Sequence, residues 1–256
     1  MARRILLTIE YDGTAYSGWQ RQYNGLAVQQ LIEEALTRAT GEAITITGAS
    51  RTDAGVHARV YVANFRTSST IPVERLPYAL NTHLPCDIVV TKAFEVHENF
   101  NAIGSCARKE YTYQIYNSRL KNPFYVNRAW FYPRHLDENV MQAAASQFVG
   151  THDFLALCAA GSSAAAHGDT VRTITDCHVT RRGDEVDIEV TADGYLYNMV
   201  RILAGTLCEV GAGRLRAADI PAILASRDRS RAGPTLPAKG LFLKRVEYPE
   251  RKEEQL

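Results

Sequence analysis

The order of predicted elements indicates an α+β protein with a mainly antiparallel sheet. Predicted strands outnumber the helices between them, and the helices fall in clusters rather than alternating with single strands. Apolar residues alternate in some segments and recur at helical spacing in others, so the elements can be told apart. The first half follows a β-α-β-β-α-β order, which is the split βαβ plan of ferredoxin-like and RRM-like domains, and the second half has a similar order.

The first half contains four predicted strands and two predicted helices. The helix over 26–40 has apolar residues at helical spacing and ends before Gly41, whereas Pro77 is expected to interrupt the short helix over 73–84. The strands are expected at 3–12, 43–49, 59–67 and 87–96.

The second half begins after an irregular stretch at 97–107. Its helices are expected at 136–150, 197–213 and 215–228, with a glycine-, serine- and alanine-rich loop at 158–170. Its strands are expected at 108–117, 128–134 and 241–249, and a hairpin at 171–193 turns at Gly183 and Asp184. We predict two domains, 1–104 and 105–256.

Composition excludes several classes of protein. Of 256 residues, 46% are hydrophobic, which is enough for a sizeable core, but no stretch approaches the roughly 20 apolar residues of a membrane span. The N-terminus reads as a strand rather than a signal peptide, so a cytoplasmic protein is expected. Five cysteines without close pairs favour buried free thiols over disulfides or zinc, and nothing in the histidine spacing indicates a metal or cofactor.

Arginine dominates the cations, although the net charge is only +1. Arginine holds phosphates bidentately and stacks on bases, which would suit a nucleic-acid partner. A GC-rich genome would produce the same bias, and composition alone leaves both readings open.

The segment SRTDAGVHA, residues 50–58, is longer than a tight connection between two strands requires. Asp53 could simply cap a turn, as aspartates in loops commonly do. Arg51 stands two residues earlier and can face the same way in an extended backbone, where its guanidinium would keep a carboxylate ionised. Such a carboxylate can act as a nucleophile or a base.

Two further segments carry candidate functional side chains. Tyr111 and Tyr113 share one face of the predicted strand 108–117, where aromatic residues also serve ordinary sheet packing. Asn198 and Arg201 stand three residues apart near the start of a predicted helix and therefore share a face. Arg201 could equally be a solvated surface cation.

The chain resembles the tRNA pseudouridine synthases of the anticodon-arm type, the tRNA pseudouridine synthase A family. SRTDAGVHA resembles the catalytic loop of that family, and KEYTYQIYN carries its tyrosine. The similarity extends to YDGTAYSGWQRQ, VRTI, GYLYNMVRILAGTL and GPTLPAKGLFLKRVEYP, in the right order along nearly the whole chain. One segment departs from the pattern, because Asn101 and Ile103 stand where the family usually has His and Arg.

The resemblance implies isomerisation of uridine to pseudouridine at positions 38, 39 and 40 of tRNA, without a cofactor. It implies an active-site cleft between two domains, with Asp53, Tyr111 and Arg201 as catalytic residues. Arg51, His57 and Asn198 are expected to bind substrate together with Tyr111. The implied partners are the anticodon arm of tRNA and a second copy of the chain, and no membrane.

Two alternatives remain. A catalytically silent tRNA-binding or chaperone protein could use the same scaffold, although it would have little reason to keep Asp53, Tyr111 and Arg201. A nucleoside hydrolase or glycosylase would release free uracil, and nothing in the sequence resembles those families.

Overall fold

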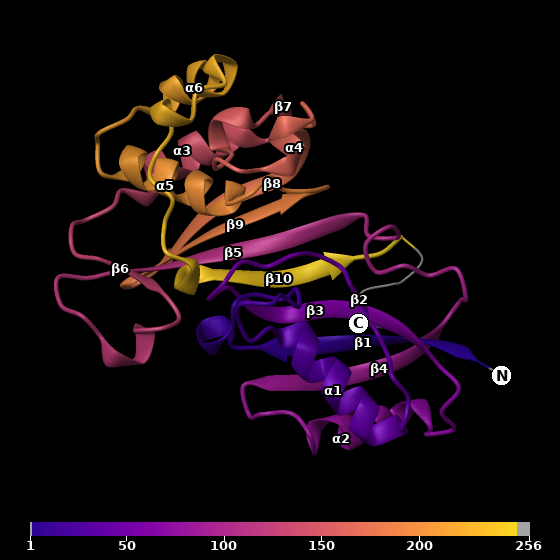
Figure 1. The fold of residues 1–256 in the computed structure, drawn as a ribbon. Helices are drawn as coiled ribbons and strands as arrows, with labels where there is room; N and C mark the ends of the chain where they lie inside the picture. Colours follow the sequence, from indigo (N-terminus) through magenta and orange to yellow (C-terminus); the bar gives the residue numbers. More distant parts are fainter. Residues whose placement is uncertain (1, 250–256) are drawn as a thin grey trace. The chain divides into compact units, whose positions relative to one another are not determined.

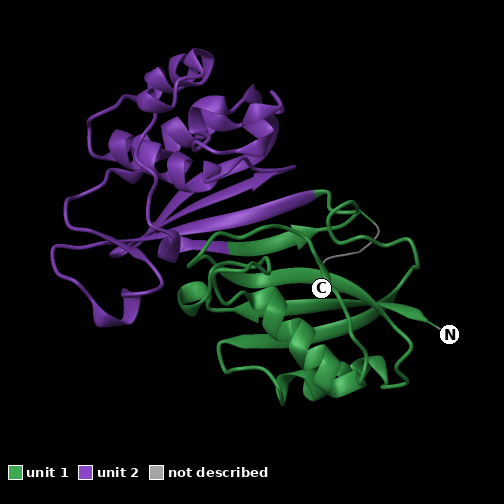
Figure 2. Cartoon of the chain, in the orientation of Figure 1, with its two compact units in different colours: residues 1–107, 243–256 green, residues 108–242 purple. Residues whose placement is uncertain are grey.

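The chain forms a mixed α/β structure in which antiparallel strands predominate. We describe residues 2–249 of a computed structural model. The chain divides into two compact units, residues 1–107 with 243–256 (unit 1) and residues 108–242 (unit 2) (Figure 2). The predicted α+β class is confirmed.

Unit 1 has the strand order of a split βαβ unit. Its strands are β1 (Arg3–Tyr11), β2 (Thr47–Gly48), β3 (His57–Thr67) and β4 (Ile88–Val96). They follow the order β4-β1-β3-β2, and every neighbouring pair is antiparallel. The C-terminal strand β10 (Leu241–Glu247), whose residues from 243 on belong to unit 1, also neighbours β3.

The helices of unit 1 are α1 (Val28–Thr40) and α2 (Leu76–Asn81), which lie over one face of its sheet (Figure 1). Gly41 ends α1 in the left-handed conformation, as the sequence predicts. The helix expected over 73–84 is divided into a 3₁₀ turn, Val73–Arg75, and α2, which follows directly. Pro77 lies in the first turn of α2, where its missing N–H has no helical partner to lose. The strand expected over 43–49 is also shorter, since only Thr47 and Gly48 pair with β3.

Unit 2 is built on a sheet with the order β5-β9-β8-β7, and β6 pairs with β5 in parallel. The strand β7 was not predicted. It has only four residues and too little alternation to be recognised. The strands are β5 (Arg108–Asn117), β6 (Trp130–Tyr132), β7 (Gly150–Asp153), β8 (Val171–Arg182) and β9 (Glu185–Ala192).

The helices of unit 2 supply the apolar layer over this sheet. The longest, α5, buries eleven of its thirteen residues, and these include Ile202, Leu203 and Leu207. The predicted loop at 158–170 contains one helical turn, α4. The four helices are α3 (Glu138–Ala145), α4 (Ser163–Ala166), α5 (Met199–Gly211) and α6 (Ile220–Ser226).

The units differ from the predicted domains in where the C-terminus belongs. Residues 243–249 contribute to unit 1, whereas the sequence analysis placed them with the second half. Compactness is a property of the folded chain and does not establish independent folding, so the division into domains at residue 104 stays a prediction.

The cysteines are not paired in disulfides. Cys158, Cys177 and Cys208 are buried as expected, but Cys86 is exposed and Cys106 is half-buried, so the prediction of buried thiols is wrong for these two. Within residues 2–249 no helix is long and apolar enough to cross a membrane. In the same range no group of three or more His, Cys, Asp or Glu side chains is placed to hold a metal ion.

The segment that departs from the family pattern is held in unit 1 by two side chains. Asn64 of β3 accepts a hydrogen bond from the Ala102 N–H at 2.7 Å, and the Tyr248 hydroxyl donates to the Ala102 carbonyl at 2.8 Å. Asn101 accepts from the N–H groups of Ile103 and Gly104, each at 3.0 Å. Asn101 therefore forms a local turn, and Ile103 is 56% exposed.

We predict that Asn64→Ala destabilises the protein by about 1–3 kcal/mol, because the buried Ala102 N–H would lose its acceptor. Urea unfolding measures the loss, and the exposed Asn24→Ala is the matched control. Equal stability of the two variants would contradict the importance of this bond.

Candidate functional site

Asp53 is the first residue of a tight turn in the connection between β2 and β3. The Val56 N–H donates to the Asp53 carbonyl at 3.1 Å, which closes a four-residue turn. Gly55, the third residue of that turn, has φ +78°, a conformation that favours glycine. The order Asp-Ala-Gly-Val therefore follows from the turn geometry, and Asp53 itself is half-buried.

A second loop of unit 1, residues 12–19, packs against the turn. The Gly55 N–H donates to the Tyr16 carbonyl and the Trp19 N–H to the Thr52 carbonyl, both at 3.2 Å. A Cβ on Gly18 would lie 2.3 Å from the Thr52 oxygen, and one on Gly13 only 1.9 Å from the Val56 oxygen. The two loops thus approach so closely that these two positions have no room for a side chain.

Aromatic side chains fix the start of the Asp53 loop. Trp19 stacks on Tyr61 with ring centroids 3.8 Å apart, and the Tyr61 hydroxyl donates to the Ser50 carbonyl. Tyr11 lies beside both rings, and its hydroxyl is 2.8 Å from the Thr52 hydroxyl. The backbone on both sides of Asp53 is therefore held by buried contacts, although Asp53 lies in a loop.

His57, expected to bind substrate, is 1% exposed. Its Nδ1 accepts from the Gly13 N–H at 3.0 Å and lies 3.1 Å from an Asp12 oxygen. These contacts tie the end of the Asp53 loop to loop 12–19, so the structure favours a positioning role for His57. Substrate binding by His57 stays a prediction, as it does for the exposed Arg51.

Tyr111, Asn198 and Arg201 belong to unit 2. Tyr111 on β5 is 6% exposed and meets Tyr195 edge-on, with centroids 5.1 Å apart. The Tyr195 hydroxyl lies 2.8 Å from the carbonyl oxygens of both Lys109 and Val190. Burial raises the pKa of Tyr195 well above its ordinary value, so this phenol stays protonated and donates. Tyr195 was not predicted as a site residue, and its ring supports Tyr111 from the turn that precedes α5.

The predicted proximity of Asn198 and Arg201 is confirmed. Asn198 precedes α5 with φ +58°, and its Oδ1 accepts from Arg201 Nη1 at 2.6 Å. Arg201 Nε donates to the Leu236 carbonyl at 2.7 Å, and the Leu236 N–H donates back to the Arg201 carbonyl at 3.3 Å. The guanidinium is thus oriented from both sides, which a solvated surface cation would not be.

The segment 233–236 that contacts Arg201 is itself packed tightly on α5. A Cβ on Gly205 would lie 1.9 Å from the Pro234 oxygen. The Gly233 N–H donates to the buried Thr206 hydroxyl at 2.9 Å. Arg229 donates to the Gly233 carbonyl at 2.9 Å and to the Thr235 hydroxyl at 3.1 Å. The position of Leu236, and through it that of Arg201, follows from these contacts.

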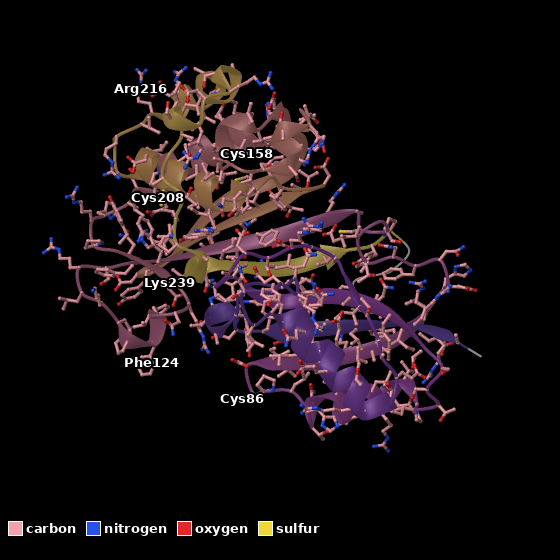
Figure 3. All side chains as sticks on the ribbon, viewed as in Figure 1. Cys86, Phe124, Cys158, Cys208, Arg216 and Lys239 are labelled. Carbon is pink, nitrogen blue, oxygen red and sulfur yellow. The ribbon has the colours of Figure 1, made fainter. Side chains whose placement is uncertain are left out.

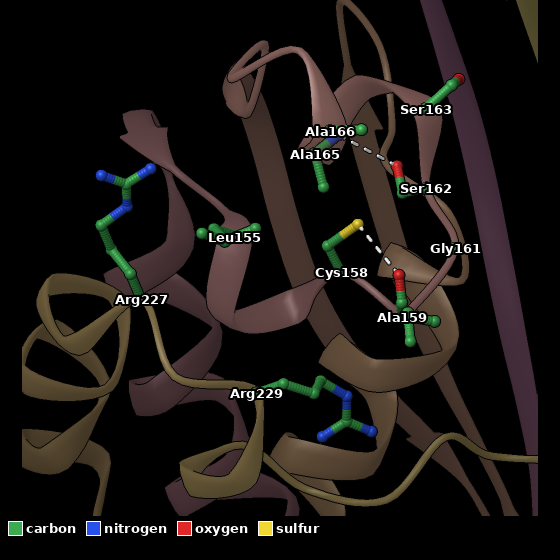
Figure 4. A pocket seen from close by; sticks show the side chains of 11 residues that line it. Leu155, Cys158, Ala159, Gly161, Ser162, Ser163, Ala165, Ala166, Arg227 and Arg229 are labelled. Atoms are coloured by element: carbon green, nitrogen blue, oxygen red, sulfur yellow. Dashed lines mark hydrogen bonds between the residues drawn. The ribbon is translucent and has the colours of Figure 1, made fainter.

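A separate pocket of unit 2, of about 560 Å³, is lined mainly by small side chains of the 158–170 tract (Figure 4). Three of its polar side chains are already engaged: Arg227 pairs with Asp153 at 3.0 Å, Arg229 holds segment 233–236, and the Cys158 thiol donates to the Ala159 carbonyl. None of the predicted site residues lines it.

We predict that Gly18→Ala costs more stability than Gly41→Ala. Both glycines have positive φ, which costs an alanine about 1–2 kcal/mol, but Gly41 has open space around it. The clash of Gly18→Ala with Thr52 should add about 1–3 kcal/mol and speed hydrogen exchange in loop 49–56. Urea unfolding and exchange measurements test this, and indistinguishable variants would contradict the close packing of the two loops.

We further predict that Thr206→Val destabilises the protein by about 1–3 kcal/mol, because the buried Gly233 N–H loses its acceptor. Thr37→Val on α1 removes the same type of helical hydroxyl from an exposed position and is the matched control. Thermal or urea unfolding measures both variants. If Thr206→Val loses no more stability than Thr37→Val, the bond between Thr206 and Gly233 does not hold the segment that orients Arg201.

Both halves of the chain are similar to known proteins. The family model for tRNA pseudouridine synthase matches residues 7–103 and 144–249. A tRNA pseudouridine synthase A of Acetivibrio thermocellus is 50% identical over 246 residues, covering 96% of this chain and all of the relative. The proteins of that name from Thermoanaerobacter sp. (strain X514) and Moorella thermoacetica are 46% identical over 96% and 48% identical over 95% of this chain. The chain therefore belongs to the tRNA pseudouridine synthase family and is an isomerase that acts on tRNA.

Proposed function

We propose that the protein converts uridine to pseudouridine at positions 38, 39 and 40 in the anticodon stem and loop of tRNA, with Asp53 as the essential carboxylate. The observation that carries the proposal is the immobilised loop around Asp53. Contacts from Tyr16, Trp19 and Tyr61 hold its backbone, although a turn whose only task is to join two strands needs no such support. Preorganisation of this kind is what a reacting group requires.

The reaction rearranges bonds without adding atoms. The N1–C1′ bond of uridine breaks, the uracil turns, and C5 bonds to C1′ while the C5 hydrogen leaves as a proton and N1 gains one. Asp53 could add to the uracil ring, attack C1′, or remove the C2′ proton to start the sequence. A carboxylate is chemically suited to each, and carboxylates form covalent intermediates at sugar carbons in glycosidases.

The target nucleotide must leave the stacked anticodon arm before it reacts, which costs a few kcal/mol, roughly. We propose that Arg51 helps to occupy the space it leaves. In the proposal Arg201, oriented by Asn198 and Leu236, pairs with Asp53 and keeps it ionised, and Tyr111 lies against the target base.

Further parts of the proposal concern the state of the protein in the cell. We propose that it works in the cytoplasm, where its substrate is found, and as a homodimer in which one tRNA spans both copies. A nearly neutral chain is compatible with this, because two copies can assemble one basic surface.

A catalytically silent tRNA-binding protein is the second candidate. The two-sided orientation of Arg201 disfavours it, since binding alone would be served by an exposed cation. Release of the C5 hydrogen separates the candidates, because only the isomerase breaks that bond.

We predict that Asp53→Asn abolishes tritium release from tRNA carrying [5-³H]uridine while tRNA affinity stays within about threefold. Loss of the reacting carboxylate should lower turnover at least about a hundredfold. Glu98→Gln removes the same charge from an exposed pair in unit 1 and is the control, expected to retain full release.

Surviving turnover in Asp53→Asn would remove Asp53 from the proposed role. Binding of tRNA by the wild type without any tritium release would instead identify the silent binding protein. Mapping of the modified positions in the product tRNA tests whether they are 38, 39 and 40.

A further inference from the structure

The loop between β5 and β6, residues 118–129, exposes an unusual set of side chains. Phe124 is 87% exposed, and Leu120 and Val126 on the same loop are 78% and 55% exposed. Figure 3 shows Phe124 at the outer turn of this loop. Single exposed apolar residues are ordinary, but three within seven residues indicate a surface that meets a partner.

The charge of the region indicates the kind of partner. From Tyr111 to Leu136 the sequence contains no Asp or Glu, whereas it contains Arg119, Lys121, Arg128 and Arg134. The first three of these cations are exposed on the loop itself. Aromatic and basic side chains interleaved on one exposed segment are typical of surfaces that bind single-stranded nucleic acid.

The loop is ordered by interactions that leave Phe124 outside. Asn122 Oδ1 accepts from the Phe124 N–H at 3.0 Å and starts a short 3₁₀ turn with Pro123 in its first position. Tyr125, the next residue, stacks on Tyr116 of β5 with centroids 4.5 Å apart and an interplanar angle of 15°. The local chain direction is therefore set before any partner binds, which lowers the entropic cost of binding.

Two more hydrogen bonds fix the base of the loop. Lys239 donates to the Val126 carbonyl at 2.7 Å, and the Tyr125 hydroxyl donates to Glu185. Asp184, the neighbouring acid, accepts from the Tyr116 hydroxyl at 3.4 Å. These two acids thus bond to the tyrosines at the base of the loop, whereas Arg119, Lys121 and Arg128 lie on its exposed part.

We propose that loop 118–129 is a second binding surface for tRNA, on which Phe124 stacks against an unpaired base while Arg119 and Lys121 bind phosphates. The inference rests on the proposed function for the identity of the RNA. It adds a binding surface that lies outside the predicted site residues. A protein partner would also cover an apolar loop, but the loop itself contains three exposed cations and no acid, which favours a polyanion.

Phe124→Ala tests the stacking interaction. Its affinity for unmodified tRNA should fall by about 5- to 150-fold, the range expected when one base–aromatic stack is removed. Phe124→Trp should retain wild-type affinity. Phe124→Leu has an apolar side chain without a planar ring, so its affinity for tRNA should fall nearly as far as that of Phe124→Ala. Tyr78→Ala on α2 removes another largely exposed aromatic ring, 72% accessible, and should bind normally.

The double variant Arg119→Gln/Lys121→Gln tests the binding of phosphates. Removal of each cation that neutralises a phosphate should reduce the slope of log affinity against log salt by about 0.7–0.9. The double variant should therefore lower the slope by about 1.5. In steady state, all affected variants should raise KM for tRNA more than they lower kcat.

Three results would overturn the proposal. Unchanged tRNA affinity in Phe124→Ala, in a preparation that still releases tritium, would reject the loop as an RNA surface and leave the proposed function intact. A shift of Phe124→Ala from dimer to monomer in sedimentation, together with equal losses for Phe124→Trp and Phe124→Leu, would assign the loop to the interface between copies. A wild type that binds no tRNA would reject the proposed function as well.

Discussion

The structure of the candidate site depends on the close approach of loop 12–19 to the connection between β2 and β3. Gly13 and Gly18 allow backbone to meet backbone where a Cβ would collide with carbonyl oxygens. Trp19, Tyr11 and Tyr61 then fill the space beside that approach and bond to the flanks of Asp53. The backbone that carries Asp53 is therefore held on both sides by hydrogen bonds and ring contacts, although Asp53 lies in a loop and is only half-buried.

In unit 2, too, a second backbone segment positions a candidate side chain. Arg201 stands in the first turn of α5, but its orientation comes from segment 233–236, which is about 30 residues away in the chain. Gly205 and Gly233 permit that segment to lie directly on the helix, and Thr206 satisfies the N–H that burial would otherwise leave unpaired. In both units a candidate side chain is positioned by a second backbone segment, so a substitution at a glycine of that contact can displace it.

Much of the fold followed from local patterns. Strand β1, helix α1 and the hairpin of β8 and β9 have strong periodicity and clear turn residues, so their prediction succeeded. The errors occurred where local signals are weak or ambiguous. Proline ends some helices and starts others, so the effect of Pro77 was ambiguous. Strand β7 is too short for alternation, and the 43–49 segment has strand-like residues but only two of them pair with β3. Exposure of Cys86 could not be inferred from residue type, since cysteine is usually buried.

The sequence by itself determined the family, the α+β class and the candidate residues Asp53, Tyr111 and Arg201, because these depend on residue identity and spacing along the chain. Only the tertiary structure decided how the candidates are held: that His57 is buried against loop 12–19, that Tyr195 supports Tyr111, and that a carbonyl of segment 233–236 orients Arg201. It also decided that Phe124 lies outside the apolar core. These features arise from packing between segments distant in sequence, and no local period or motif encodes which distant segment will meet which.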